Sequence, residues 1–173
     1  TGTGKTAAYL LPILMKVKYA QGDEPRAVIL APTKELTIQI AEHAVALAKY
    51  TDLRILPVYG GIGPKTQIEW LRQGTDILIA TPGRFTELYM KGELPTTHIQ
   101  FLVLDEADRM MDMGFMHQLR KILEVVPRKR QNLLFSATFS ERVEKLSAEF
   151  LEFPIKVEVT PQATAAKQVE QEI

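Results

Sequence analysis

The sequence predicts an α/β domain with a mainly parallel sheet and helices on both faces. Short runs of aliphatic and β-branched residues alternate along the chain with longer segments of helical periodicity. Most of the short runs are nearly continuous in apolar residues, as strands covered on both faces must be. The stretches between them are long enough for crossovers that each contain a helix. A length of 173 residues fits one such domain.

Six strands are expected from the apolar runs. In a parallel sheet the functional residues lie on the loops just after the carboxyl ends of the strands, so these loops are the places to look for chemistry. The expected strands are residues 27–30, 55–58, 77–80, 101–104, 133–136 and 155–159.

Six helices are expected between the strands. In the segment 35–50 the apolar residues Leu36, Ile40, Ala44 and Leu47 recur at i, i+4, i+8 and i+11, which is one face of a helix. Pro82 and Gly83 begin the fourth helix and Ser140 is a candidate N-cap for the last. The expected helices are residues 5–18, 35–50, 65–72, 84–90, 116–125 and 141–150.

The domain is expected to end near residue 159. Residues 160–173 are dominated by Gln, Ala, Lys and Glu and show no strong apolar period. We therefore expect this segment to be a linker or a frayed end.

The composition excludes several classes of protein. Twenty-one Lys and Arg residues balance 21 Asp and Glu residues, so net charge cannot hold nucleic acid and specific contacts would be needed. The absence of cysteine excludes a disulfide scaffold and a thiolate metal site. The longest apolar run, residues 7–15, falls far short of the roughly 20 residues that cross a bilayer. We expect a monomeric cytoplasmic domain with no membrane partner.

A glycine-rich segment precedes the first expected helix. Gly2 and Gly4 let the backbone curl so that consecutive N–H groups face one concave space, where the helix N-terminus adds partial positive charge. Lys5 can reach terminal phosphates, and the Thr6 hydroxyl is placed to bind Mg²⁺. A flexible Gly/Thr-rich arm is the alternative, and this segment alone does not decide between the two.

Acidic residues follow directly after the expected strand 101–104. A carboxylate at the end of a buried strand is costly unless a cation lies beside it. An Mg²⁺–nucleotide complex would supply that cation, with Asp105 holding the metal and Glu106 orienting and deprotonating the attacking water. A helix N-terminus with acidic first-turn residues is the alternative. The glycine-rich segment and the acidic pair together favour phosphate chemistry.

With these motifs the chain resembles the first RecA-like domain of a DEAD-box RNA helicase, over residues 1 to about 160. The resemblance implies a RecA-like P-loop NTPase fold. The matching segments are Thr1–Thr6 (motif I), Pro32-Thr33-Lys34-Glu35-Leu36 (motif Ia, with Lys34 where the family usually has Arg), Gly60-Gly61 (GG), Thr81-Pro82-Gly83-Arg84 (motif Ib), Asp105-Glu106-Ala107-Asp108 (motif II) and Ser136-Ala137-Thr138 (motif III). Residues 157–161 and 164–166 resemble the bacterial RhlE subgroup.

The resemblance also implies roles for individual residues, with ATP and Mg²⁺ as cofactors. ATP would be bound by Thr1, Gly2, Thr3, Gly4, Lys5 and Thr6, and Mg²⁺ by Thr6 and Asp105, while Lys5, Asp105 and Glu106 would be catalytic. Asp108, Ser136 and Thr138 would couple hydrolysis to RNA strand separation. The RNA backbone would be contacted, without sequence preference, by Pro32, Thr33, Gly60, Gly61, Thr81, Gly83 and Arg84.

Taken without the family, several of these motifs have ordinary structural explanations. Ser136 and Thr138 are then strand-end hydroxyls that cap the next turn. Gly60-Gly61 is then a flexible loop, and Thr81-Pro82-Gly83 is a turn that begins a helix.

The resemblance further implies a partner domain, to which residues 160–173 would be the start of the connection. The family's Q motif, the strand before motif I and the second RecA-like domain with its arginine fingers lie outside these residues, so we expect the chain to be part of a longer protein. An arginine finger is typically worth about 10³–10⁵ in rate, so the isolated fragment is expected to be nearly inactive. A DNA translocase of the same fold and an ATP-gated RNA clamp with dormant catalysis are the alternatives.

Overall fold

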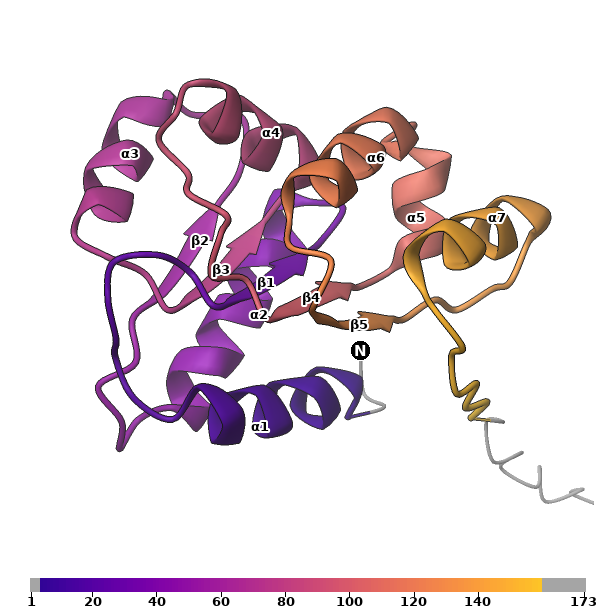
Figure 1. The fold of residues 1–173 in the computed structure, drawn as a ribbon, viewed down its shortest axis with the longest axis horizontal. Coiled ribbons are helices and arrows are strands. Elements are labelled where there is room, and N and C mark those ends of the chain that lie inside the picture. The colour runs from indigo at the N-terminus through magenta and orange to yellow at the C-terminus, as the bar shows by residue number, and fades with distance from the viewer. Residues whose placement is uncertain (1–3, 160–173) are drawn as a thin grey trace, which may run out of the picture.

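A five-stranded parallel sheet lies between two layers of helices in the computed structural model, which describes residues 4–159 (Figure 1). Along the sheet the strand order is β2-β3-β1-β4-β5, and every neighbouring pair is parallel. The strands are β1 (Ala27–Leu30), β2 (Ile55–Val58), β3 (Ile77–Ala80), β4 (Phe101–Leu104) and β5 (Gln131–Leu134).

The helices follow the strands in alternation, with α5 and α6 both lying between β4 and β5. They are α1 (Lys5–Val17), α2 (Lys34–Leu47), α3 (Pro64–Arg72), α4 (Pro82–Met90), α5 (Ala107–Asp112), α6 (Met116–Val125) and α7 (Glu141–Phe150). Within residues 4–159 no helix has the length and apolar character needed to cross a membrane.

The carboxyl ends of all five strands meet at one edge of the sheet. Leu30, the last residue of β1, pairs with Ala80 and with Leu104, the last residues of β3 and β4. Ala80 in turn pairs with Val58, and Leu104 pairs with Leu134. The strands therefore end in register, and the loops that follow them form one continuous rim.

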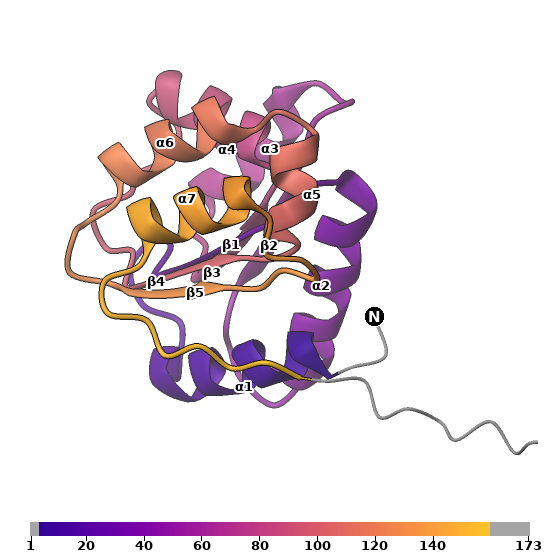
Figure 2. The ribbon, with the colours of Figure 1, turned by 90° about the vertical axis from the view of Figure 1, so that its right-hand side faces the viewer.

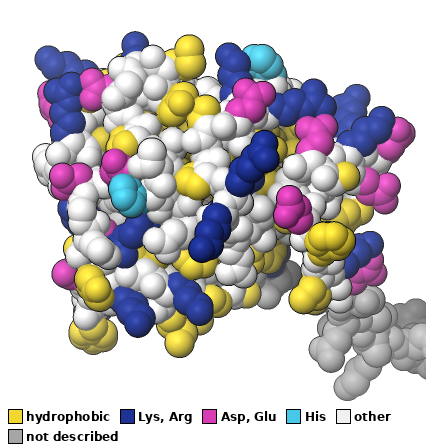
Figure 3. All heavy atoms as spheres, viewed as in Figure 1, with side chains coloured by type: hydrophobic (Ala, Val, Ile, Leu, Met, Phe, Trp, Pro, Cys, Tyr) yellow, Lys and Arg dark blue, Asp and Glu magenta, His cyan; other side chains and the backbone are white. Residues whose placement is uncertain are grey.

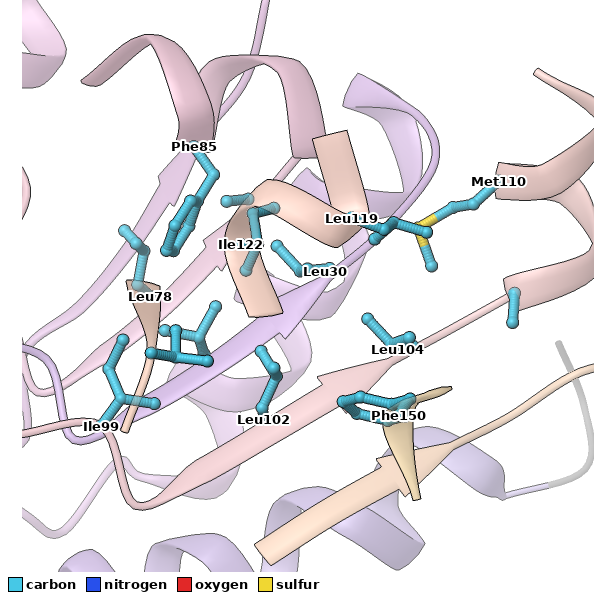
Figure 4. Packing of buried hydrophobic residues seen from close by; sticks show 14 of the residues in the cluster. Leu30, Leu78, Phe85, Ile99, Leu102, Leu104, Met110, Leu119, Ile122 and Phe150 are labelled. Atoms are coloured by element: carbon cyan, nitrogen blue, oxygen red, sulfur yellow. The ribbon is translucent and has the colours of Figure 1, made fainter. Parts of the chain in front are cut away.

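Alternate residues of each strand enter two separate cores. In β1, Val28 and Leu30 pack toward α3 to α7, whereas Ala27 and Ile29 pack toward α1 and α2. Figure 2 shows the two helical layers on opposite sides of the sheet. Figure 4 shows the first core, in which Phe85, Ile122 and Phe150 from three helices meet Leu102 and its neighbours in the sheet. β1, β3 and β4 are buried on both faces, as their continuous apolar runs predict.

The expected strand at 155–159 is wrong. The segment is extended but pairs with no described strand, and its apolar side chains are open to solvent, with Ile155 92% and Val157 78% exposed. Its residues alternate between apolar and charged, which is the pattern of a strand with one covered face. Nothing in residues 4–159 covers that face, so the pattern alone does not produce a strand.

The last strand of the sheet begins two residues before its expected position. β5 covers Gln131–Leu134 rather than 133–136, and it lies at the end of the described sheet. Gln131 is exposed and Asn132 half-buried, so the strand starts with polar residues that an apolar-run criterion passes over. Ser136 is thereby left on the loop after the strand.

The helices differ from expectation in three respects. α3 begins at Pro64, one residue before its expected start, because proline fits the first helical turn, where its missing N–H costs nothing; α4 begins at Pro82, the proline expected to begin it. The six-residue helix α5 was not expected. In α2 the expected apolar face is only partly buried, since Leu47 is 42% exposed while Thr37 and Ala41 are buried.

An ion cluster closes the opposite, amino-terminal edge of the sheet. Asp76, which is 0% exposed, accepts hydrogen bonds from the guanidinium of Arg26 at 2.8 Å and from Nε of Arg54 at 3.0 Å. Arg26 also donates to the carbonyls of Val17 and Tyr19, which ties the end of α1 to β1 and β3. Burial alone would raise the pKa of Asp76, but the bonds from both arginines and two backbone amides lower it to about 2.

Candidate functional site

The first turn of α1 is free to bind an anion. Gly4 adopts φ +70°, a left-handed conformation suited to glycine, and no side-chain cap or acidic first-turn residue among the described residues 4–159 satisfies the amides of this helix end. Unsatisfied amides and the helix dipole make such a terminus a phosphate site. Three of the expected nucleotide ligands, Thr1, Gly2 and Thr3, lie outside the described residues.

The acidic pair after β4 lies directly beside this helix end. The Nζ of Lys5 is 3.8 Å from Oδ1 of Asp105, although the two residues belong to distant parts of the sequence. Asp105 is only 3% exposed, whereas a third of the Lys5 side chain reaches solvent. The structure therefore brings together the glycine-rich segment and the acidic motif, as the sequence predicts.

Asp105 is held by two further donors. The backbone N–H of Glu106 donates to its Oδ1 at 2.9 Å, and the hydroxyl of Tyr9 donates to its Oδ2, also at 2.9 Å. Tyr9 lies one helical turn after Lys5, so both side chains project from the same face of α1. Burial, with help from the Asp105 carboxylate, raises the pKa of Tyr9 far above its usual value, so its hydroxyl keeps its proton.

Glu106 occupies an uncommon backbone conformation at the start of α5. Its φ of 51° and ψ of 53° place a non-glycine residue in the left-handed region, a conformation that costs of order 1 kcal/mol. Its side chain is half-buried and its Oε2 lies 3.3 Å from Nη1 of Arg109. Strain of this kind is concentrated at functional sites, where it fixes the direction of a side chain.

A pocket of about 330 Å³ opens between the N-terminal turn of α1, the end of β4 and one side of α2. Polar residues line one side of it: Gly4, Lys5, Thr6, Asp105 and Glu106. The wall formed by α2 is largely apolar and is contributed by Leu36, Gln39, Ile40, His43, Ala46 and Leu47. The sequence predicts the polar side, but nothing in its pattern identifies α2 as the other wall.

The donor set of this pocket fits a magnesium–nucleotide complex. Mg²⁺ prefers oxygen ligands, and proteins usually supply one or two carboxylates together with the phosphates of a substrate. Asp105, Glu106 and the hydroxyl of Thr6 offer such oxygens on the pocket wall. Lys5 and the uncapped amides of α1 offer the positive partners that a triphosphate requires.

The residues of motif III are bonded to those of motif II. The hydroxyl of Thr138 donates to Oδ2 of Asp108 at 3.1 Å, and the backbone N–H of Asp108 donates to Oγ of Ser136 at 3.2 Å. The Ser136 hydroxyl itself donates to the carbonyl of Thr138 at 2.7 Å. These three residues, expected to act together, form one hydrogen-bonded unit across the ends of β4 and β5.

The residues expected to contact RNA lie on the other half of the same rim, after β1, β2 and β3. Gly60 and Gly61 are exposed, and Gly61 has φ +88°, which a residue with a side chain would adopt only at a cost. Thr33 caps α2 by accepting from the Leu36 amide at 3.2 Å. Of the remaining expected contacts, Gly83 is half-buried, and Pro32 and Thr81 are buried.

Arg84, which is expected to contact RNA, does not present its charge to solvent. The side chain is 5% exposed and forms an ion pair with Glu87 at 2.9 Å. It donates to Oε1 of Gln67 at 2.9 Å and to the carbonyl of Ile62 at 2.6 Å. Arg84 therefore holds the loop after β2 against α4 from inside the protein.

Sequence reasoning missed two side chains that shape these sites. Gln67 is fully buried and bonds both the N–H and the carbonyl of Tyr59, directly before the glycine pair. Tyr9 reaches Asp105, as described above. Spacing offers a weak signal for Tyr9, four residues after Lys5, but none for Gln67, whose partners Tyr59 and Arg84 lie outside its own helix turn.

The sequence of this chain matches a known protein family and several named relatives. The sequence matches the DEAD/DEAH box helicase family over residues 1–146. The ATP-dependent RNA helicase RhlB of Pseudomonas putida is 44% identical and is matched over 100% of this chain and 46% of its own length. RhlB of Shewanella baltica is 43% identical, with 100% of this chain and 41% of the relative covered.

Solved structures agree with this placement. The crystal structure of the yeast DEAD-box splicing factor Prp28 matches with a TM-score of 0.82 at 35% identity, over 88% of this chain and 38% of that chain. The expected RecA-like α/β fold is confirmed by this likeness and by the parallel sheet. The chain spans less than half the length of the relatives it matches.

Proposed function

Because this chain belongs to the DEAD/DEAH box helicase family, we propose that it is the ATP-binding core domain of an ATP-dependent RNA helicase. The observation that carries the proposal is the 3.8 Å approach of Lys5 Nζ to Asp105 Oδ1 at the uncapped end of α1. The relatives named above carry the name RhlB and give no support to the RhlE subgroup expected from residues 157–166. A cytoplasmic location and a monomeric domain remain predictions.

The mechanism assigns each polar group of the pocket a task. Lys5 and the first amides of α1 would hold the terminal phosphates, and Thr6 and Asp105 would be the protein ligands for Mg²⁺. The chemistry that Mg²⁺ supplies is neutralisation of the charge that develops on the transferred phosphoryl group. Glu106, directed by its left-handed backbone, orients the attacking water and accepts its proton.

We propose that a second RecA-like domain of the whole protein supplies an arginine that completes this site. Within residues 4–159, the lining of the pocket beside α1 includes no arginine to face a transferred phosphoryl group. In phosphoryl transfer such an arginine is worth about 10³–10⁵ in rate. Its supply by the second domain would make hydrolysis depend on closure of the two domains.

RNA is proposed to bind along the rim formed by the loops after β1, β2 and β3. The exposed Gly60-Gly61 backbone allows close approach of a sugar–phosphate chain, and Lys34, whose Nζ lies 5.2 Å from the centre of the Tyr59 ring, adds a cation beside it. Basic and acidic side chains are mixed on the face seen in Figure 3, in keeping with the zero net charge. Binding would thus rest on local backbone contacts that carry no base code.

RNA is expected to stimulate ATP hydrolysis by the full-length protein, whereas single-stranded DNA of equal length is expected to leave the hydrolysis rate unchanged. Steady-state ATPase assays with the two polymers test this and separate an RNA helicase from a DNA translocase of the same fold. Affinity for several RNAs of one length should agree within about threefold at fixed salt and should fall as salt rises. Equal stimulation by DNA, or a strong preference for one RNA sequence, would count against the proposal.

The hydrogen-bonded unit of Asp108, Ser136 and Thr138 is proposed to couple hydrolysis to strand separation. It links the residues that follow Glu106 to the end of β5, so a shift at one motif is transmitted to the other. Replacing Ser136 and Thr138 together by Ala should lower RNA unwinding by about tenfold more than ATP hydrolysis, since the catalytic groups themselves remain. Duplex-unwinding and ATPase rates of the full-length variant measure the ratio, and an equal fall in both would refute the coupling role.

A further inference from the structure

We infer that Tyr9 is a positioning residue for Asp105, and that its hydroxyl keeps the metal-binding carboxylate in place when Lys5 turns to phosphate. The inference rests on the proposed function of the pocket and deepens it. It is carried by the 2.9 Å hydrogen bond from the Tyr9 hydroxyl to Oδ2 of Asp105, both residues being almost completely buried.

The two carboxylate oxygens of Asp105 have partners of different kinds. Oδ1 lies on the side of Lys5 and also accepts the Glu106 amide, whereas Oδ2 is engaged by Tyr9. The Lys5 contact is long for a hydrogen bond at 3.8 Å, and the Lys5 side chain is 33% exposed. Lys5 is therefore free to leave Asp105 when a phosphate attracts it, and Tyr9 is not.

The ring of Tyr9 is fixed by packing against the ring of Phe135. It lies 5.2 Å from the ring of Phe135, at an interplanar angle of 45°. The carbonyl of Phe135 accepts the amide of Ala107 at 2.9 Å, so Phe135 is tied to the residues that follow Glu106. Tyr9 thus contacts both Phe135, the first residue after β5, and the Asp105 carboxylate, from a helix that also carries Lys5 and Thr6.

The hydrogen bond from Tyr9 stabilises the buried negative charge of Asp105. A carboxylate that is 3% exposed is stable only while donors or cations engage its oxygens. If Lys5 moves to phosphate before metal is in place, Oδ2 still has its donor and the side chain keeps its direction. Groups that orient a metal ligand in this way typically change metal affinity by 10–100-fold when they are removed.

The test is Tyr9→Phe in the full-length protein, which removes one oxygen atom and retains the ring that packs on Phe135. The matched control is Tyr19→Phe. Tyr19 is 57% exposed just beyond the end of α1, and its hydroxyl makes no hydrogen bond within residues 4–159. The readout is the affinity for a fluorescent ADP analogue, titrated at graded Mg²⁺ concentrations and in the absence of Mg²⁺.

Tyr9→Phe is expected to raise the Mg²⁺ concentration needed for half-maximal tightening of nucleotide binding by about tenfold. Affinity without Mg²⁺ should stay within about twofold of wild type, and the control should match wild type throughout. An unchanged Mg²⁺ dependence would overturn the inference, as would an equal loss of affinity with and without Mg²⁺, which marks a merely structural role. If the wild-type protein itself shows no Mg²⁺-dependent nucleotide binding, the proposed function fails and the inference falls with it.

Discussion

Replacing Glu106 by Gln in the full-length protein is expected to lower kcat for ATP hydrolysis by about 10²–10⁴-fold. Gln keeps the size of the side chain and its place beside the pocket, but its amide cannot accept a proton from the attacking water. Lys5, Thr6 and Asp105 are untouched, so the affinity for ATP–Mg²⁺ should change by less than about threefold. Single-turnover hydrolysis and equilibrium nucleotide binding measure the two quantities separately.

The control for this variant is Glu69→Gln, which makes the same chemical change at an exposed position of α3. It should leave both kcat and nucleotide affinity at wild-type values. The pair of variants also decides between an enzyme and an ATP-gated RNA clamp with dormant catalysis, because a clamp should lose nothing when Glu106 is changed. Hydrolysis by Glu106→Gln within threefold of wild type would contradict the catalytic role.

Asp76→Asn is expected to cost about 3 kcal/mol of folding stability, the lower end of the range for breaking a buried ion pair. The variant leaves Arg26, which is 8% exposed, without its charged partner. The loss is moderated because about a third of the Arg54 side chain reaches solvent. Urea unfolding of the full-length protein measures the change, and hydrogen exchange of the amides of β1 and β3 identifies the transition of this domain.

The matched control is Glu149→Gln, which removes one partner of an exposed pair. Arg120 donates to Glu149 at 2.8 and 3.0 Å, so its geometry is as favourable as that of the Asp76 cluster, but both side chains are largely in water. Exposed pairs contribute about 0–1 kcal/mol. Equal effects of Asp76→Asn and Glu149→Gln would show that the buried cluster is not a main support of the fold.

The ion cluster around Asp76 is expected to make the folding stability fall at low pH. The pKa of Asp76 is about 2 in the folded protein against 3.8 as its ordinary value, so folding favours the charged form. Its contribution is complete above about pH 4 and is lost as the pH falls toward 2. The difference in stability between wild type and Asp76→Asn should therefore shrink over that interval.

The sequence predicts the parts of this molecule that depend on local pattern. β1, β3 and β4 lie where the apolar runs place them, because strands covered on both faces need little more than continuous hydrophobicity. The edge of the described sheet departs from that rule: β5 begins with Gln131 and Asn132, which are partly in solvent. The segment 155–159 has the pattern without a neighbour, and so it does not pair.

In the candidate site, too, the features that depend on local sequence pattern could be predicted, and those that depend on tertiary contacts could not. The positions of Lys5 and Asp105 could be predicted because Lys5 begins α1 and Asp105 directly follows β4, and both elements show in the local sequence pattern. The inward turn of Arg84 could not, because its partners Gln67 and Ile62 come from a different helix and loop. Tyr9 was missed for a related reason, since a buried tyrosine on an apolar helix face looks like ordinary core until its hydroxyl is placed.

The central claim is that the start of α1 and the acidic pair after β4 bind one magnesium-bound triphosphate between them. The most direct measurement is a crystal structure of the full-length Glu106→Gln protein with ATP, Mg²⁺ and a single-stranded RNA. We expect terminal phosphates on the first turn of α1 within hydrogen-bonding distance of Lys5 Nζ, and the metal on the side of Asp105. A nucleotide bound elsewhere, with Lys5 and Asp105 both free of it, would contradict it.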